Sequence, residues 1–202
     1  CITKKNCQSF AGCHVYLPLV PENVTFKSRI VLLEHRSQSI TVLPRHDLMA
    51  VGFPSTWAEL GIGDEKIILG CVYREWRDAN GNGSRDEQRQ RLHVFFGQIE
   101  RAMREKKKIL ILGDLNLDFS RIGKDYSEHS LASELRDFLE SSGLENIDIG
   151  PTFSMNTGSK EEPRITSTCI DHVYTGNETE LKSAIAVKNG LSDHNPVVVE
   201  IK

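Results

Sequence analysis

The stretch that decides the fold is "KKKILILGDLNLDF", residues 106–119, in which three lysines lead into four apolar residues and then into Gly-Asp-Leu-Asn. The run 109–112 is apolar at every position, which is typical of a strand buried on both faces between layers. Side chains two apart on a strand point the same way, so Asp114 and Asn116 are expected to project together into one pocket. Such a pair could hold a water molecule, a metal ion or a phosphate oxygen, although Asp and Asn also close strands as plain turn residues.

Composition places the chain among ordinary globular proteins. The 202 residues, of which 39% are hydrophobic and 26% charged, fit a single domain spanning 1–202. The net charge is −3, whereas nucleic-acid binders are often basic, but a bound metal can supply positive charge where a phosphate reacts. No stretch approaches a membrane span, so no membrane partner is expected. The five cysteines form no CxxC pair, which indicates reduced, partly buried thiols.

Helix and strand patterns alternate along the chain. Ser84 and Glu87 have the spacing of a capping box, and the apolar residues that follow recur on one face, which predicts a helix over about 85–106. A second helix is expected over 128–142, before Gly143. Short β-rich runs predict strands at 29–33, 39–43, 66–73, 109–112, 144–149, 169–175, 183–187 and 196–201. This interleaving predicts mixed sheets in an α/β or α+β layered domain.

Further acidic residues accompany the predicted strands. Asp171 lies inside an otherwise apolar strand, where an unpaired charge costs roughly several kcal/mol unless it is paired or bound. Asp193 and His194 directly precede the last predicted strand. Each residue alone could be structural, His194 as a satisfied histidine and Asp193 as a turn residue. Together with Asp114 they indicate a metal-dependent phosphodiester site.

Three motifs, in their order along the chain, resemble those of the endonuclease/exonuclease/phosphatase superfamily: Gly113-Asp114-Leu115-Asn116, Ile170-Asp171-His172 and Ser192-Asp193-His194. This superfamily includes apurinic endonucleases, deoxyribonuclease I and the endonuclease domains of non-LTR retrotransposons. A Tyr-Arg pair at 73–74, followed by a predicted helix and then by the first motif, looks most like the retrotransposon branch. The resemblance covers about residues 29–202.

The resemblance implies a four-layer sandwich of two mixed β-sheets flanked by helices. It also implies hydrolysis of a phosphodiester with Mg²⁺ or Mn²⁺, in which Asp193 lies near the metal together with Asp114. Asp114 would contact or deprotonate the attacking water, and Asn116 would orient that water or a phosphate oxygen.

The remaining site residues would act on the phosphate. By the same resemblance, His194 would contact the scissile phosphate, and Asp171 would orient and charge it. Tyr73 would donate a hydrogen bond to a phosphate oxygen, and Arg74 would bind the substrate. Positioning and charge neutralisation of this kind are what in-line attack at phosphorus needs.

The sequence departs from the family at its start. The first two family motifs, an Asn at the end of the first strand and a metal-binding Glu, have no match in residues 1–28. The chain begins with Cys1 and its first methionine is Met49, so we expect a piece of a longer product that lacks the first strand and helix. We therefore expect the isolated chain to nick DNA weakly or not at all.

Several readings of the function stay open. The expected partner is DNA, the expected setting is intracellular and nuclear, and a reverse transcriptase domain could follow in the parent polypeptide. One alternative is a non-catalytic remnant that binds nucleic acid through Arg74 and Arg164. Another is a phosphodiesterase or phosphatase of the same superfamily that acts on phospholipid, inositol phosphate or an RNA tail. The compact length and the run "YREW" at 73–76 favour DNA.

Overall fold

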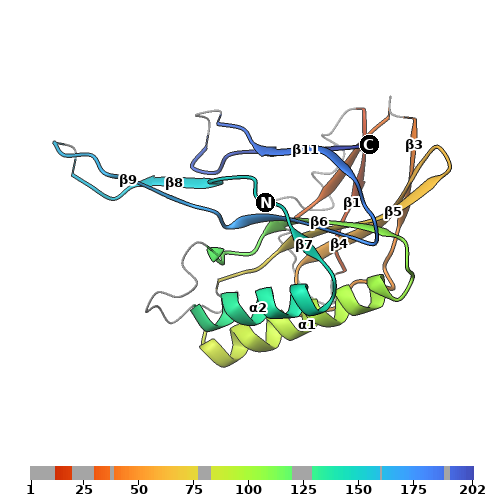
Figure 1. Ribbon diagram of the computed structural model, residues 1–202, viewed down its shortest axis with the longest axis horizontal. Coiled ribbons are helices and arrows are strands. Elements are labelled where there is room, and N and C mark those ends of the chain that lie inside the picture. The colour runs from red at the N-terminus through yellow and green to blue at the C-terminus, as the bar shows by residue number, and fades with distance from the viewer. Residues whose placement is uncertain are drawn as a thin grey trace.

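A six-stranded sheet forms the centre of the protein (Figure 1). The computed structural model describes residues 12–19, 30–36, 39–76, 83–119, 129–159, 161–188 and 192–202. The strand order is β3-β4-β5-β6-β10-β7. Their bounds are Ile40–Pro44 for β3, Ser55–Ile62 for β4, Glu65–Tyr73 for β5, Lys108–Asp114 for β6, Asp171–Gly176 for β10 and Glu145–Asn146 for β7. Within this sheet β5 and β6 run parallel and every other neighbouring pair is antiparallel, so the sheet is mixed as expected.

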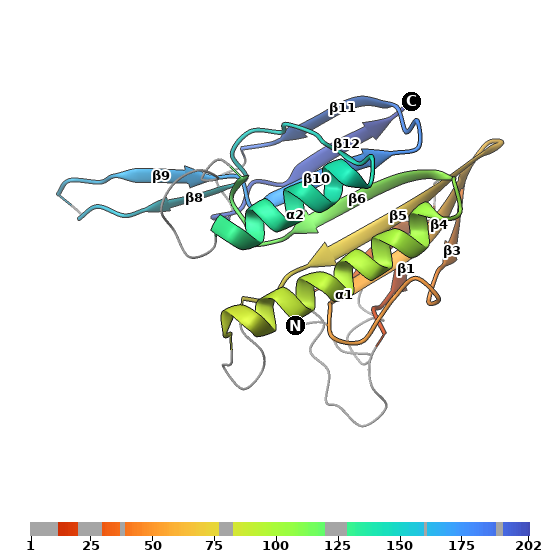
Figure 2. The same cartoon turned by 60° about the horizontal axis from the view of Figure 1, so that its bottom comes forward.

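Two helices cover one face of this sheet (Figure 2). Helix α1, Arg85–Met103, makes the crossover between the parallel strands β5 and β6, and helix α2, His129–Ser141, follows β6. The predicted capping box is present, because Ser84 accepts from the backbone of Glu87 and the Glu87 side chain accepts from the backbone of Ser84. Helix α1 ends three residues before the predicted 106, because Lys106 has a positive φ of 54° that takes the chain out of the helix.

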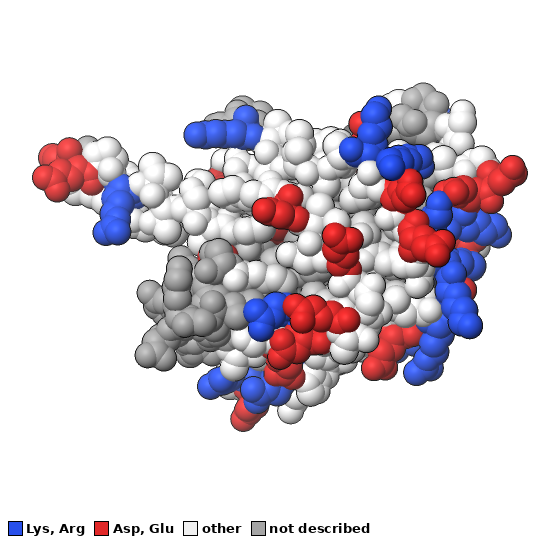
Figure 3. Space-filling view, in the orientation of Figure 1, with Lys and Arg blue, Asp and Glu red and all other residues white. Residues whose placement is uncertain are grey.

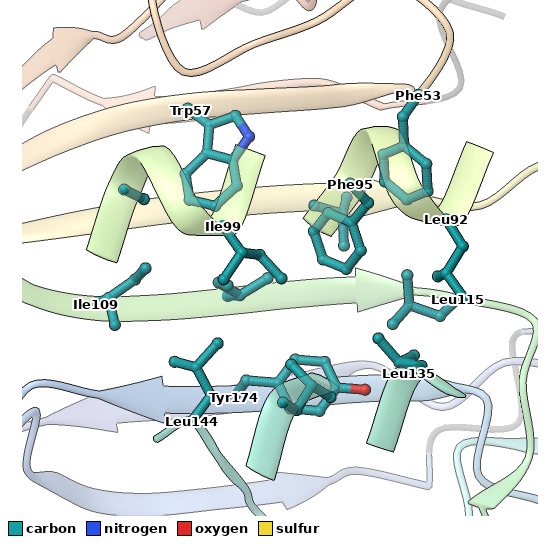
Figure 4. Packing of buried hydrophobic residues seen from close by; sticks show 14 of the residues in the cluster. Phe53, Trp57, Leu92, Phe95, Ile99, Ile109, Leu115, Leu135, Leu144 and Tyr174 are labelled. Carbon is teal, nitrogen blue, oxygen red and sulfur yellow. The ribbon is translucent and has the colours of Figure 1, made fainter. Parts of the chain in front are cut away.

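The larger core lies between the helices and the sheet, as Figure 4 shows. Phe95 and Ile99 of α1 and Trp57 of β4 are all 0% exposed. The Trp57 indole nitrogen donates to the Gln98 side chain at 2.8 Å, so the one polar atom of that ring has a partner. The second helix, α2, contributes Leu135 to the same core, and this residue is also fully buried. This packing holds in place the central strands whose ends carry the candidate site.

The opposite face of the sheet carries a second apolar layer. It is formed by two small antiparallel sheets, one of β11 (Leu181–Ala186) with β12 (Val197–Ile201) and one of β1 (Cys13–Tyr16) with β2 (Leu32–His35). Apolar residues of β2, β11 and β12 pack on this face of the central sheet. The predicted mixed α/β fold is thereby confirmed, and in the described part of the chain both helices lie on the side away from these small sheets.

A two-stranded arm extends from the body of the molecule (Figures 1 and 2). It consists of β8, Phe153–Asn156, paired antiparallel with β9, Ile165–Thr168. The sequence did not predict these strands, because both are only four residues long and neither has a buried position. It also missed β1 and β4, and the predicted strand at 144–149 pairs only at 145–146.

The described helices include none that is long and apolar enough to cross a membrane. The predictions about the first strand and the metal-binding Glu concern residues 1–28, of which only 12–19 are described.

Candidate active site

Strand register brings three of the predicted site residues into one row. In the parallel pair of β5 and β6, Tyr73 stands opposite Asp114, and in the antiparallel pair of β6 and β10, Asp114 stands opposite Asp171. Figure 2 shows the arrowheads of β5 and β6 pointing the same way, toward the end from which the arm projects. Position 113 needs a glycine because β6 lies close to β5 there. Gly113 has a φ of 155°, and an added Cβ would lie 1.9 Å from the carbonyl oxygen of Val72.

His194 reaches the row from the C-terminal segment. Its Nδ1 lies 3.0 Å from Oδ2 of Asp171, and because a carboxylate only accepts, Nδ1 carries the proton in this hydrogen bond. The backbone of His194 forms an isolated bridge with Phe153, whose ring meets the imidazole edge-on with centroids 5.0 Å apart. The imidazole therefore leaves its other nitrogen, Nε2, for a substrate.

Thr152 joins the two members of this pair, and sequence reasoning did not find it. Its hydroxyl oxygen accepts from the backbone nitrogens of Ile170 at 3.1 Å and Asp171 at 3.0 Å. Its carbonyl accepts from the backbone nitrogen of Asn195 at 2.6 Å. Thr152 is 0% exposed, so it acts through these contacts and not on a substrate. Nothing in the local sequence marks it, since the contacts are made by segments far along the chain.

The side chains of Asp114, Asp171 and His194 form one cluster, in which the possible ligand atoms lie within 4.8 Å of one another. Burial raises the pKa of Asp114 to about 6, against a hydrogen bond from the backbone of Asn116 that lowers it, and the Asp171 carboxylate raises it further. Two carboxylates this close and half-buried fit a hard divalent cation, which takes oxygen ligands and would balance their charge. The donor set therefore suits Mg²⁺ or Mn²⁺, with His194 as the softer neighbour.

The cluster opens into a pocket of about 520 Å³. Tyr73, Asp114, Asp171 and His194 line it together. Its apolar wall comes from the layer of small sheets and the strands beneath it: Ile30, Cys71, Leu112, Pro196 and Val197. Burial raises the pKa of the Cys71 thiol to about 12, so Cys71 is an apolar wall residue and not a nucleophile. A pocket with one polar end and an apolar wall is the usual form of a ligand site.

Asp193, predicted to lie near the metal, is not part of this cluster. Its side chain is exposed, and one carboxylate oxygen accepts from the Ser192 hydroxyl at 3.1 Å. Its carbonyl accepts from the backbone of Ser154 at 2.9 Å. The chain bends at 192–193, and there the Asp193 side chain bonds to Ser192 while the His194 side chain bonds to Asp171. The expected convergence therefore holds for positions 114, 171 and 194; Asp193 lies outside that cluster, and its predicted place near the metal stays a prediction.

Arg74, predicted to bind substrate, is a buried structural residue. Its side chain is 1% exposed, and its guanidinium donates to the carbonyls of Leu115 at 2.5 Å and Asn116 at 2.9 Å and to the Gln88 side chain at 2.6 Å. A guanidinium that is buried and bonded to the protein in this way is not available at the surface for a phosphate. The sequence could not separate the two roles, because both place Arg directly after the Tyr73 strand.

Asn116 completes this arrangement from the other side. Its amide nitrogen donates to the carbonyl of Arg74 at 2.9 Å, and its backbone nitrogen donates to Asp114 Oδ1 at 2.8 Å. It adopts a positive φ of 50° and does not line the pocket described above. The structure thus places Asn116 beside Asp114, where it fixes the carboxylate and the end of β5, and the predicted contact to water or phosphate stays a prediction.

His172 of β10 contacts the segment that follows Asp114, at Leu117. It is 3% exposed, and its Nε2 lies 2.7 Å from the carbonyl of Leu117, which can only accept. Burial lowers the pKa of His172, so the ring is neutral and carries its proton on Nε2. Asp171 and His172 both line the pocket, but only Asp171 belongs to the cluster with Asp114 and His194, whereas the His172 imidazole holds the backbone at Leu117.

The fold is that of the endonuclease/exonuclease/phosphatase superfamily, and the chain is a member of it. Within it, a family described as "Endonuclease-reverse transcriptase" matches residues 68–198, which is more than half of the chain, and the chain belongs to that family. A comparison with curated protein sequences gave no match.

Several solved structures share the fold. The endonuclease domain of TRAS1, a telomere-specific non-LTR retrotransposon, matches with a TM-score of 0.70 and 18% identity over 96% of this chain and 81% of that one. The 3′ phosphatase NExo from Neisseria, bound to a product DNA hairpin, matches with a TM-score of 0.61 and 15% identity over 100% and 83%. TDP2 from D. rerio, complexed with a single-strand DNA product, gives 0.58 and 12% over 96% and 79%. At these identities the likeness shows the fold alone.

Proposed function

We propose that this protein is a divalent-metal-dependent endonuclease of retrotransposon type that nicks DNA. The observation that carries the proposal is the meeting of Asp114 with the Asp171–His194 pair in one pocket. Family membership supports the same class of chemistry. The three structural relatives act on or bind DNA by their descriptions or belong to a retrotransposon, which favours DNA over a lipid or sugar phosphate.

The residues divide the work of hydrolysis between them. Asp114 can accept a hydrogen bond or a proton from the attacking water, and its pKa of about 6 belongs to the carboxylate without a bound cation. His194, oriented by Asp171, can donate from Nε2 to a phosphate oxygen when it is protonated. Tyr73 lies opposite Asp114 and can donate its phenolic hydrogen to another phosphate oxygen. A divalent cation held by Asp114 and Asp171 would neutralise charge on the phosphate.

The arm offers a surface for the strand that carries the scissile phosphate. It starts at Phe153, which touches His194, and it leads away from the body of the molecule (Figure 1). Along it stand the exposed side chains of Met155, Ile165 and Arg164. Figure 3 shows basic and acidic side chains interspersed on this face, so affinity from a uniform basic surface is not expected there. We propose that DNA crosses the pocket with the arm against it.

Plasmid nicking in the presence of Mg²⁺ or Mn²⁺ tests the proposal. Because residues 1–28 offer no match to the metal-binding Glu of the superfamily, nicking by this chain is expected to be slow, so high enzyme concentration and long incubation are needed. Asp114→Asn and His194→Ala should each abolish the nicks, and Asp64→Asn, at an exposed turn, should leave them unchanged. Equal nicking by the wild type and Asp114→Asn would show that the site does not perform the reaction.

Metal binding gives a second readout that does not need turnover. Titration with Mn²⁺, followed by electron paramagnetic resonance, should show one site that is lost in Asp114→Asn and kept in Asp64→Asn. A wild type that neither nicks nor binds the ion would favour the alternative of a non-catalytic member of the fold. Two further expectations depend on this proposal: a reverse transcriptase in the parent polypeptide and action in the nucleus. If the proposal is refuted, both lose their support.

A further inference from the structure

An exposed tryptophan follows the strand that brings Tyr73 to the candidate active site. The chain has two tryptophans, and they differ sharply: Trp57 is 0% exposed in the core, whereas Trp76 is 49% exposed. Trp76 follows Tyr73, a pocket residue, by three positions, so their Cα atoms are at most about 10 Å apart. An indole that stays half exposed to water does not contribute the full stabilisation that burial of its apolar surface would give.

The backbone that carries this indole is held firmly. Three consecutive carbonyls each accept a hydrogen bond from a side chain of another segment: Arg74 O from Asn116 Nδ2 at 2.9 Å, Glu75 O from Arg91 Nη1 at 3.4 Å, and Trp76 O from Gln88 Nε2 at 2.7 Å. Two of these donors lie on α1 and the third follows Asp114. The backbone at Trp76 is thus fixed relative to both α1 and the segment that follows Asp114.

A buried cation also lies near the ring. The guanidinium carbon of Arg74 is 5.9 Å from the centroid of the Trp76 ring, which is within the range of a cation–π contact. The same guanidinium donates to Leu115 and Asn116, so the ring is linked to the segment that follows Asp114. The arrangement combines an aromatic face open to solvent, a hydrogen-bonded backbone beneath it and a nearby positive charge. Proteins that stack nucleobases on aromatic side chains use the same features.

We propose that Trp76 stacks on an unpaired nucleobase of a nucleic-acid strand whose phosphate occupies the pocket. This rests on the proposed function and adds to it a specificity-determining residue and a preference for unpaired or splayed bases. One strand of duplex DNA advances about 3.4 Å per nucleotide, so a base within about three nucleotides of the reacting phosphate reaches Trp76. Stacking is tolerant of sequence, because every base has a π-face.

Tryptophan fluorescence tests the proposal directly, because the two indoles differ in exposure. The difference between the emission of the wild type and that of Trp76→Leu isolates the signal of Trp76. Titration with a short single strand of deoxythymidylate, in EDTA so that no hydrolysis occurs, should quench that signal. An intact duplex of the same length should quench it less. Binding is followed in parallel by the anisotropy of a labelled strand.

The variants then separate stacking from a structural role. Trp76→Leu should bind the single strand about 10- to 100-fold more weakly, and Trp76→Phe, which keeps an aromatic face, should lose less. Leu43→Ala removes another exposed apolar side chain, on β3, and should bind like the wild type. Unchanged affinity in Trp76→Leu, unquenched emission at saturation, or equal quenching by strand and duplex would each overturn the proposal.

The outcome is distinguishable from failure of the nuclease assignment. Asp114→Asn should lose nicking and still show quenching, because stacking does not use the carboxylate. A nicking wild type without quenching would reject the role of Trp76 alone.

Discussion

Replacing Asp114 by Asn should stabilise the folded protein at neutral pH while abolishing its proposed activity. The pKa of Asp114 is raised from 3.8 to about 6, chiefly by burial. The folded state therefore binds the proton more tightly than the unfolded state, and the free energy of unfolding falls as pH rises from about 4 through about 6. At ~1.4 kcal/mol per pKa unit this amounts to about 3 kcal/mol, and partial contact with solvent reduces it to roughly 1–2 kcal/mol.

Asparagine keeps the shape of this side chain and its acceptor for the backbone nitrogen of Asn116, and removes only the charge. Urea unfolding of both proteins in EDTA, across the pH range, measures the effect. The two should be nearly equal around pH 4, and Asp114→Asn should be more stable by roughly 1–2 kcal/mol at neutral pH. Asp64→Asn, at an exposed turn, serves as the control and should show no such divergence.

Addition of Mg²⁺ should raise the stability of the wild type and not that of Asp114→Asn, since only the former keeps both carboxylates. If Asp114→Asn proves no more stable than the wild type at neutral pH in EDTA, the carboxylate is not the desolvated, uncompensated charge that the structure describes. The assignment of Asp114 as a proton acceptor would then lose its electrostatic support.

Three further outcomes follow from the structure. Arg74→Leu should lower the free energy of unfolding in urea, because it leaves three buried or partly buried neutral acceptors without their donor, each at a cost of about 1–3 kcal/mol; a total loss below about 1 kcal/mol would contradict the buried role. Thr152→Val should cost about 1–3 kcal/mol by leaving two backbone nitrogens without an acceptor, and it should slow nicking more than a Thr152→Ser control does. Phe95→Ala should cost about 3–5 kcal/mol in the same assay, and a small effect would mean that the helix–sheet core is not packed as described.

The sequence predicted the part of the site that depends on strand ends. Asp114 and Asp171 were found because a charged residue beside a buried strand is costly, and that cost is visible in the sequence itself. Asp193 and His194 are adjacent in sequence and look equivalent there, but only His194 joins the cluster in the folded chain. Thr152 was missed because its contacts come from segments that meet only in the folded chain.

The same reasoning explains the fold predictions. The capping box at Ser84 and the apolar face of α1 are local signals, and they gave the helix start correctly. Strand β4 carries Ala58, Glu59 and Gly61 in its middle and second half, so its sequence lacks both the alternation and the β-branched content that mark a strand. Its identity comes from pairing between β3 and β5 and from Trp57, which packs under α1.

The parallel pairing of β5 with β6 has a kinetic consequence. Tyr73 and Asp114 meet only after the whole of α1 has crossed over, and His194 joins them from a segment more than a hundred positions beyond Tyr73. Each of these encounters closes a long loop before any contact rewards it. In a refolding experiment the helical signal should therefore return before the ability to bind a divalent ion, and a partly folded chain should have helices but no metal site.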